Sequence, residues 1–402
     1  MLRAYRDLPT AVHLLCLGTF VNRAGSFVLV FLTLYVDEGL GYGPAFAAWC
    51  MGVFGLGSIL ASIVGGHLAD QIGRRTVMVS ALLGGAALLV VLSMVQSPVL
   101  LVLGIFAFSL VVDTYRPAAA AMIGDLASPE QRTRAFGLLY ISINLGFTCG
   151  AALGGIIASY SFQWLFLGDA LTTGIFGLGI VAFLPETRPK HSGEQSEDDA
   201  PSQGVPFLEA VRHVFSDGPF LMFCLATLAL AMVFMQGMST LPLYLRAEHG
   251  ITERTYGFLM AINGLMIFLG QLPLTSWLER YNRMTIIVLG GIAISIGFGI
   301  TQLGTTAAFF ALTVVLWTLG EMMHAPFTNS IVTDLAPTAL RARYQGMLAM
   351  CFSGALTIGA PIGGEVLARF GSGALWSGAF TLGLLACALY LSAHRAIMRR
   401  VS

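Results

Sequence analysis

Four ionisable residues stand inside long apolar runs of this chain, where charged side chains are costly. Asp113 and Arg116 are three residues apart, and so are Glu321 and His324. Residues at this spacing share one face of a helix, and each pair comes just before a proline. A buried acid beside a base can exchange protons, and histidine changes its charge near neutral pH. We therefore predict a proton-coupling role for these four residues, with static ion pairs inside the helices as the alternative.

A further buried charge, Arg23, follows Asn22 in the first apolar run. It lies deep enough that its guanidinium group would reach the membrane surface only awkwardly. It could bind an anionic group of a substrate or pair with Asp113, and a purely structural or surface-reaching arginine is the other interpretation. Asp169, in the sixth apolar run, is expected to be structural.

Polar and aromatic residues on other apolar runs could line a cavity together with Asn22 and Arg23. Each of them alone is more often part of a helix-packing hydrogen bond than a ligand. As a set they predict an amphipathic pocket for a small-molecule substrate. These residues are Tyr35, Tyr140, Asn144, Gln236, Asn263 and Trp317.

The elements that must position these residues are membrane-spanning helices. Of the 402 residues, 56% are hydrophobic and only 10% are charged, whereas a soluble protein usually carries about 25% charged residues. A helix needs about 20 apolar residues to cross the hydrocarbon core of a bilayer. The sequence offers twelve such stretches, at 11–36, 45–68, 76–96, 99–125, 134–159, 163–184, 219–245, 254–277, 285–304, 306–333, 343–369 and 372–396.

The two halves of the chain are related by a constant shift of 209 residues. Pro117 and Asp125, for example, correspond to Pro326 and Asp334. Such a repeat predicts two bundles of six helices related by an axis along the membrane normal. The expected fold is an all-α polytopic membrane protein with an N-terminal bundle at 1–185 and a C-terminal bundle at 219–402. Residues 186–218 form a polar linker that ends in a short amphipathic helix at 206–216.

The turn between the second and third helices reads Gly-His-Leu-Ala-Asp-Gln-Ile-Gly-Arg-Arg over residues 66–75. It resembles motif A of the major facilitator superfamily, which has Gly-x-Leu-Ala-Asp-Arg-x-Gly-Arg-Arg at this place. Gln71 is the one departure from that pattern. The second half carries a weaker copy, in which Asn282 replaces Gly73.

Both halves place an acid and a base in this loop and a second acid at the same end of the fourth or tenth helix. Arginine between carboxylates forms charge-assisted hydrogen bonds that can lock one conformation. We predict a gate here, with a fixed structural turn as the alternative. The gate residues are Asp70, Arg74 and Asp125 in the first half, and Glu279, Arg283 and Asp334 in the second half.

The glycine-rich stretch at 146–155 resembles motif C of the antiporters of the same family, with Ala151 in place of its proline. The arginine that motif B places early in the fourth helix is missing from this chain. The resemblance covers the whole chain and implies two bundles that rock about a central cavity. We expect proton-coupled export of small amphipathic molecules of the multidrug type. The alternative is proton-linked symport of a defined polar or anionic solute.

Several other functions are not expected. The sequence shows no nucleophile–base or metal-ligand set and no nucleotide-binding Gly-x-x-x-x-Gly-Lys, so we expect no enzyme activity and no cofactor, with a proton gradient as the driving force. The formal net charge of zero gives no attraction to nucleic acid. Most basic residues fall on one side of the predicted helices, which places both termini in the cytoplasm and the protein in the inner membrane. We expect a monomer whose partners are its substrate, protons and lipid.

Overall fold

The structure is a computed structural model that describes residues 7–187, 213–337 and 340–401. Within these ranges the regular structure is helical, and no strand occurs. The elements are α1 (Thr10–Ala24), α2 (Phe27–Leu34), η2 (Tyr35–Gly39), α3 (Pro44–Ile72), α4 (Arg74–Leu92), α5 (Pro98–Val112), α6 (Tyr115–Leu126), α7 (Pro129–Ala158), α8 (Phe162–Phe183), α10 (Gly218–Ser239), α11 (Leu241–His249), α12 (Glu253–Leu278), α13 (Arg283–Gly299), η4 (Ile300–Leu303), α14 (Ala307–Leu335) and α15 (Arg341–Val401).

The predicted membrane-spanning architecture is confirmed. In the described ranges, eleven helical stretches are long and apolar enough to cross a membrane. The last of them, Arg343–Arg400, contains Gly371 at φ 80°, where one helix ends and another begins. Its 58 residues would extend about 87 Å as one helix, whereas the hydrocarbon core is about 30 Å thick. This stretch therefore makes two crossings, which brings the total to the predicted twelve.

The predicted linker at 186–218 lies largely outside the described residues, because these omit 188–212. Most of the amphipathic helix predicted for 206–216 falls in the same gap. Residues 213–216 are helical, with Val214 buried and Phe215 exposed. The domain boundaries at 185 and 219 stay a prediction.

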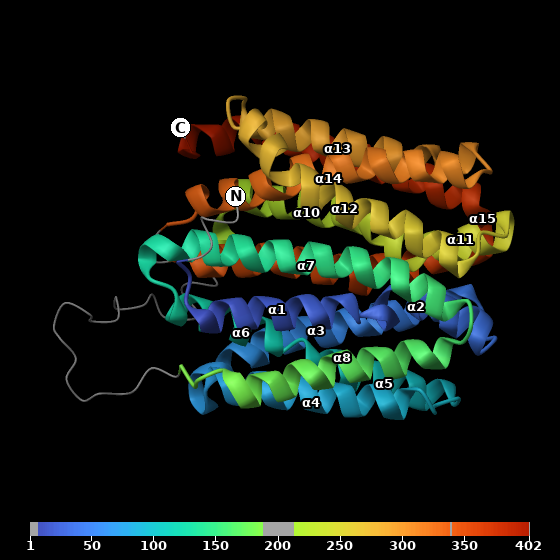
Figure 1. Ribbon diagram of the computed structural model, residues 1–402. Helices are drawn as coiled ribbons and strands as arrows, with labels where there is room; N and C mark the ends of the chain where they lie inside the picture. Colours follow the sequence, from blue (N-terminus) through green and yellow to red (C-terminus); the bar gives the residue numbers. More distant parts are fainter. Residues whose placement is uncertain (1–6, 188–212, 338–339, 402) are drawn as a thin grey trace, which may run out of the picture. The chain divides into compact units, whose positions relative to one another are not determined.

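The chain forms two compact units. The first consists of Met1–Pro189, Met238–Phe268 and Ala360–Ala368, and the second of Lys190–Gly237, Leu269–Gly359 and Arg369–Ser402. In the first unit α1 packs along α7, α3 along α5 and α4 along α8, and in the second α13 packs along α14 (Figure 1).

The fourth membrane-spanning helix (helix 4) is broken into two segments, α5 and α6, because it contains Pro117. Proline has no backbone N–H, so the Asp113 carbonyl loses its usual partner four residues on. It accepts instead from the backbone N–H of Arg116, at 3.2 Å. At the equivalent Pro326 the helix stays continuous, and the side chain of Gln271 donates to the freed Met322 carbonyl at 3.0 Å.

Glycines on α7 allow α1 to lie directly against it. A Cβ at Gly146 would come within 2.5 Å of the Arg23 Cβ, and a Cβ at Gly150 within 2.7 Å of the Arg23 carbonyl oxygen. Neither distance can be accommodated without a shift of one helix. Small residues at a helix interface give the close packing that replaces the hydrophobic effect inside a membrane. The glycine stretch that resembles motif C therefore fixes the position of Arg23.

We expect Gly150→Ala to destabilise the protein by about 1–3 kcal/mol, the usual cost of overpacking. The matched control is Gly179→Ala on α8, where an added Cβ would meet nothing within 4 Å. The control should be neutral or slightly stabilising, because alanine favours helix more than glycine does. Thermal unfolding of the purified variants in detergent measures both effects. Equal unfolding temperatures for the two variants would contradict the close approach of α1 and α7.

Candidate functional site

A small cavity in the first compact unit collects charged side chains from three helices. Its volume is about 30 Å³, and Arg23, Asp113, Arg116 and Asp169 all line it. A cavity of this size holds one or two water molecules, whereas a drug-sized ligand needs several hundred Å³. The geometry therefore suits the binding of protons or water, and a larger substrate needs another place.

The break in helix 4 presents Asp113 and Arg116 to this cavity. The predicted pairing of the two is present, with Arg116 Nε 3.0 Å from Asp113 Oδ1. The Asp113 side chain is only 5% exposed, whereas that of Arg116 is 46% exposed. The second carboxylate oxygen of Asp113 is buried and has no hydrogen-bond partner among the described residues. It is thus the acceptor that remains open in the cavity.

Arg23 reaches the cavity from the last turn of α1. Its Nε is buried and has no hydrogen-bond partner in the described part of the chain. Its guanidinium group is close enough to interact electrostatically with Asp113, Asp169 and Arg116. Binding of an anionic substrate group and pairing with Asp113 were the two functional roles predicted for Arg23, and the structure places it among charges of both signs.

Asp169 enters from α8 and is buried, with 4% of its surface exposed. Its carboxylate accepts hydrogen bonds from the Thr173 hydroxyl at 3.2 Å and from the Val28 backbone N–H at 3.3 Å. The Asn22 side chain in turn donates to Thr173 Oγ1 at 2.8 Å. The cluster thus contains two arginines and two aspartates, and its formal charges balance. The sequence was interpreted as giving Asp169 only a structural role, although an acid inside an apolar run is itself a sign of a functional site.

The second predicted pair lies elsewhere, in the second compact unit. His324 is buried, and its Nε2 lies 2.9 Å from the hydroxyl of Tyr390. That hydroxyl is also 2.8 Å from Thr227 Oγ1. Glu321 lies on the same helix, one turn earlier, and is partly buried. The proton-coupling role of Glu321 and His324 stays a prediction.

Most of the other predicted ligand residues lie away from the charged cavity. Only Asn22 and Arg23 line it. Gln236 is buried and donates to the Gly359 carbonyl, and Trp317 stacks on Phe298. Tyr35 packs edge-on against Phe166, and Asn144 donates to the Tyr140 carbonyl. Asn263 is buried on α12. Their role as a substrate pocket stays a prediction.

The motif A loop is held by an ion pair and by a cap from the residues that follow α8. Arg74 Nε lies 3.0 Å from Asp125 Oδ2, and the Thr187 hydroxyl donates to the same oxygen at 3.0 Å. Glu186 accepts from the backbone N–H groups of Arg75 and Thr76, each at 3.3 Å. These N–H groups start α4 after Gly73, which has φ 102° and no side chain to cap them. We call these contacts of Arg74, Asp125, Glu186 and Thr187 the loop clasp.

Of the predicted gate residues, Arg74 and Asp125 are thus in contact, whereas the side chain of Asp70 lies outside the described residues. Glu186 and Thr187 were missed, because they stand more than 100 residues from the loop in sequence.

The second repeat holds its equivalent loop in a different way. Arg283 pairs with Asp334 and donates to Ser330 Oγ at 3.0 Å. Asn282, which replaces Gly73, caps α13 by accepting from the Thr285 N–H at 3.1 Å. This local cap makes a remote carboxylate unnecessary. Glu279 lies just beyond α12 and is exposed.

An ion-pair network lies at the other end of the first unit, close to the start of α3. Arg246 Nε is 2.6 Å from Glu38 Oε1, and Arg246 Nη2 is 3.6 Å from Glu253 Oε1. The hydrogen bond to Glu38 raises the pKa of Arg246, so the guanidinium stays charged at physiological pH. This network joins a residue of the first repeat to two of the second.

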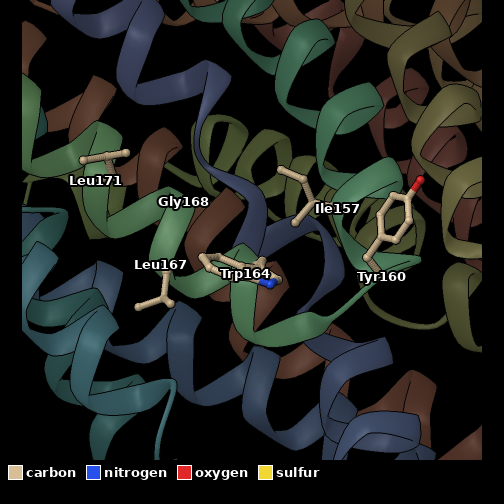
Figure 2. Close-up of a pocket in the computed structure, with 6 residues that line it drawn as sticks. All are labelled: Ile157, Tyr160, Trp164, Leu167, Gly168 and Leu171. Atoms are coloured by element: carbon tan, nitrogen blue, oxygen red, sulfur yellow. The ribbon is translucent and has the colours of Figure 1, made fainter.

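A groove of about 750 Å³ lies on the outside of the first unit (Figure 2). Ile157 and Tyr160 line it from the end of α7, and Trp164, Leu167, Gly168 and Leu171 line it from α8. Tyr160 and Trp164 are 85% and 62% exposed, as is typical of aromatic residues at a membrane–water interface. None of the lining residues is charged, so the groove offers no group for proton coupling.

We expect Asp125→Asn to weaken the loop clasp. The substitution removes the charge that faces Arg74, whose side chain is only 9% exposed. A partly buried pair of this kind can shift a two-state balance by about 1–3 kcal/mol, so transport should fall while expression is retained. A Gln71→Cys reporter in a background without the six native cysteines should then react faster with an impermeant maleimide.

Asp334→Asn is the matched control for this experiment. The side chains of Arg283 and Asp334 are 41% and 44% exposed, and exposed pairs contribute only about 0–1 kcal/mol. Its reporter rate and transport should stay close to those of the parent protein. If Asp125→Asn behaves in the same way as this control, the clasp is a fixed turn and not a gate.

Known proteins resemble this chain over nearly its whole length. The family model of the Major Facilitator Superfamily matches residues 15–360 and 238–399 of this chain. The MFS-type transporter YttB of Bacillus subtilis is 30% identical over 383 residues, which cover 92% of this chain and 91% of that protein. A Na(+), Li(+), K(+)/H(+) antiporter of Planococcus maritimus is 26% identical, with 88% of each chain covered. The multidrug resistance protein MdtH of Proteus mirabilis is 23% identical, with 85% of this chain and 82% of that protein covered.

Solved structures confirm the fold. The peptide transporter POT superposes with a TM-score of 0.81 at 18% identity, covering 98% of this chain and 96% of that chain. The nucleoside transporter NupG gives a TM-score of 0.73 at 16% identity, covering 98% of this chain and all of that chain. At these identities the likeness concerns the arrangement of helices and not the substrate.

Proposed function

The chain belongs to the Major Facilitator Superfamily of membrane transporters, and we propose that it exports small amphipathic molecules in exchange for protons. The observation that carries this proposal is the charge-balanced cluster of Arg23, Asp113, Arg116 and Asp169, in which both aspartates are buried. Ionisable residues inside a membrane are costly and mark ion pathways or proton relays. The cavity they line is too small for a substrate, so it suits a coupling site separate from the substrate pocket.

Asp113 is the proposed proton acceptor. Its Oδ1 is held by Arg116, whereas its Oδ2 is buried without a partner among the described residues and is open to the cavity. A proton that binds at Oδ2 neutralises the carboxylate and leaves the cluster with one excess positive charge. The ion pair with Arg116 then loses its attraction, and any conformation that changes the junction between α5 and α6 becomes less costly. A metal cation needs several oxygen ligands, whereas Asp113 Oδ2 is the one carboxylate oxygen of the cluster without a partner among the described residues, which disfavours a metal cation.

Two further features support export. The glycine stretch on α7 has the pattern that resembles the antiporter motif, and in the structure it seats the backbone of Arg23. Relatives named as a multidrug resistance protein and as a cation/proton antiporter match most of the chain. We also propose that the loop clasp faces the cytoplasm, because most basic residues lie at that end of the predicted helices.

We expect Asp113→Asn to uncouple transport from the proton gradient. The purified protein is reconstituted in liposomes, and uptake of a panel of lipophilic cationic dyes is followed under an imposed pH gradient. Gradient-driven uptake should fall by about 5- to 150-fold, the range of typical coupling free energies, while dye exchange without a gradient persists. Asparagine keeps the size and one acceptor oxygen of the side chain, so the loss reports the missing proton site.

Asp7→Asn is the control for that experiment, because the Asp7 side chain is 76% exposed. It should leave gradient-driven uptake unchanged. Full proton-driven transport by Asp113→Asn would overturn the assignment of Asp113. The predicted pair of Glu321 and His324 would then be the next candidate for the coupling site.

Symport of an anionic solute with protons is the second candidate function. The observation that favours it is the Arg23 guanidinium, whose buried Nε has no hydrogen-bond partner among the described residues. A carboxylate or phosphate group would satisfy such a donor. The fold of this superfamily is compatible with transport in either direction, so the fold does not decide between export and symport.

Arg23→Gln separates the two functions. If Arg23 binds an anionic substrate, the variant should transport anionic compounds far less well than neutral or cationic ones, and Arg23→Lys should restore part of the loss. If Arg23 serves the charge balance of the coupling site, all substrate classes should lose proton-driven transport equally. Uptake of one anionic, one neutral and one cationic fluorescent probe, each with and without a pH gradient, gives the answer.

A further inference from the structure

The first membrane-spanning helix (helix 1) consists of α1 and α2. It is interrupted in the middle of the first unit, next to the charged cavity. The segment α1 ends at Ala24 and α2 begins at Phe27. Gly25 lies against α8 so closely that an added Cβ would come within 1.9 Å of Thr172 Oγ1. The first N–H groups of a helix have no partner within that helix. The break therefore creates donors that the interior of the bundle must satisfy.

Asp169 satisfies one of these donors from another helix. Its Oδ2 accepts from the N–H of Val28, the second residue of α2, at 3.3 Å. The N-cap residue of α2, Ser26, makes no side-chain capping hydrogen bond of its own. A carboxylate at a helix N-terminus also interacts favourably with the helix dipole. Asp169 is therefore a remote cap for the second segment of helix 1.

The same carboxylate is linked to the first segment. Its Oδ1 accepts from the Thr173 hydroxyl at 3.2 Å, and Thr173 Oγ1 accepts from the Asn22 side chain at 2.8 Å. Asn22 lies in the last turn of α1. One side chain on α8 thus holds both sides of the break in helix 1.

This arrangement needs the ionised form of Asp169. A carboxylate offers two acceptor oxygens, and both are used. A protonated carboxyl group keeps one good acceptor and gains one donor. If the proton sits on Oδ2, the Val28 N–H loses its partner. If it sits on Oδ1, that group becomes a donor to Thr173 Oγ1, and the Thr173 hydroxyl hydrogen loses its acceptor at Asp169.

We propose that Asp169 is a second proton-binding residue of this protein, and that the proton it takes loosens the junction between α1 and α2. The inference rests on the proposed proton coupling and extends it from Asp113 to a backbone hinge. The proton comes from the cavity and adds to one carboxylate oxygen, and no other bond forms or breaks except the hydrogen bonds named above.

The surroundings of Asp169 can support such a change of charge. Arg23 interacts electrostatically with it from α1, and Asp113, Tyr115 and Arg116 line the same cavity from the junction of α5 and α6. From α2 it receives the N–H of Val28, and no residue of α4 or α7 lines the cavity. When Asp113 is protonated, Arg23 loses one of two negative neighbours. The two acids therefore compete for one positive environment, which makes their protonation interdependent.

The first test detects the proton itself and needs no substrate. Infrared difference spectra of the reconstituted protein are recorded during a pH titration, and the band of a protonated carboxyl group is followed. We expect one component of this band to disappear in Asp169→Asn and to move in frequency in Asp169→Glu. Thr173→Val is the matched control, because it removes a hydrogen bond to the carboxylate but no titratable group. It should retain the component.

The second test reads the hinge. Asp169→Asn resembles the protonated state, so amide hydrogen exchange of the segment around 27–30 should be faster than in the parent protein at the same pH. Thr173→Val keeps the bond between Asp169 and Val28, so exchange in that segment should stay close to the parent value. Equal acceleration in both variants would reduce Asp169 to a structural role.

These outcomes are independent of the proposed export function. If no dye is transported by the parent protein but the carboxyl band depends on Asp169, the substrate proposal fails and the proton site stands. If proton-driven transport is found but the carboxyl bands of Asp169→Asn, Asp169→Glu and the parent are identical over the whole titration, the export proposal stands and the second proton site is overturned. The glutamate variant keeps the test decisive where the asparagine variant does not fold.

Discussion

The first compact unit depends on one constraint, which is that charges and unpaired backbone groups inside an apolar bundle need partners from the protein itself. Two helices are broken there, helix 1 at Gly25 and Ser26 and helix 4 before Pro117. Both breaks border the cavity that holds two arginines and two aspartates. The hydrocarbon core offers no hydrogen-bond partners, so each backbone group released by a break has to be satisfied by the protein, from the backbone or, at Val28, from the Asp169 side chain. Chemistry and backbone irregularity thus occur at the same place.

The two repeats meet this constraint in different ways. The first repeat places charged groups at its breaks, with the ion pair of Asp113 and Arg116 beside its proline and Asp169 as a cap at the start of α2. The second repeat uses neutral ones, because Gln271 satisfies the carbonyl freed by Pro326, while His324 contacts the hydroxyl of Tyr390. The described charged cavity accordingly belongs to the first repeat. Divergence of this kind lets one repeat carry a cluster of charges while the other repeat keeps the same helix frame.

Contacts at the two ends of the helices follow a similar logic. The loop clasp joins the start of α4 to the end of helix 4 and to the residues after α8, all within the first repeat. Arg246 instead joins Glu38 of the first repeat to the second repeat. Partly exposed ion pairs of this kind have directional geometry, and water can replace each partner at modest cost.

Much of this protein follows from the sequence alone. The length and spacing of the apolar runs gave the twelve crossings, because a helix must be about 20 residues long to span the bilayer core. The pairing of Asp113 with Arg116 and of Arg74 with Asp125 also followed, the first from helix periodicity and the second from the repeated loop.

Only the tertiary structure decided which distant side chains meet. Asp169 caps α2 across 141 residues of sequence, and Glu186 caps α4 across more than 100. Such contacts depend on how each helix is rotated about its axis, and an apolar run in a membrane carries little pattern that fixes this rotation. Only the structure shows that Trp317 stacks on Phe298 and that Gln236 donates to the carbonyl of Gly359, and their predicted role as substrate ligands stays a prediction. Sequence determines that a helix crosses the membrane, and packing determines which of its faces meets a charge.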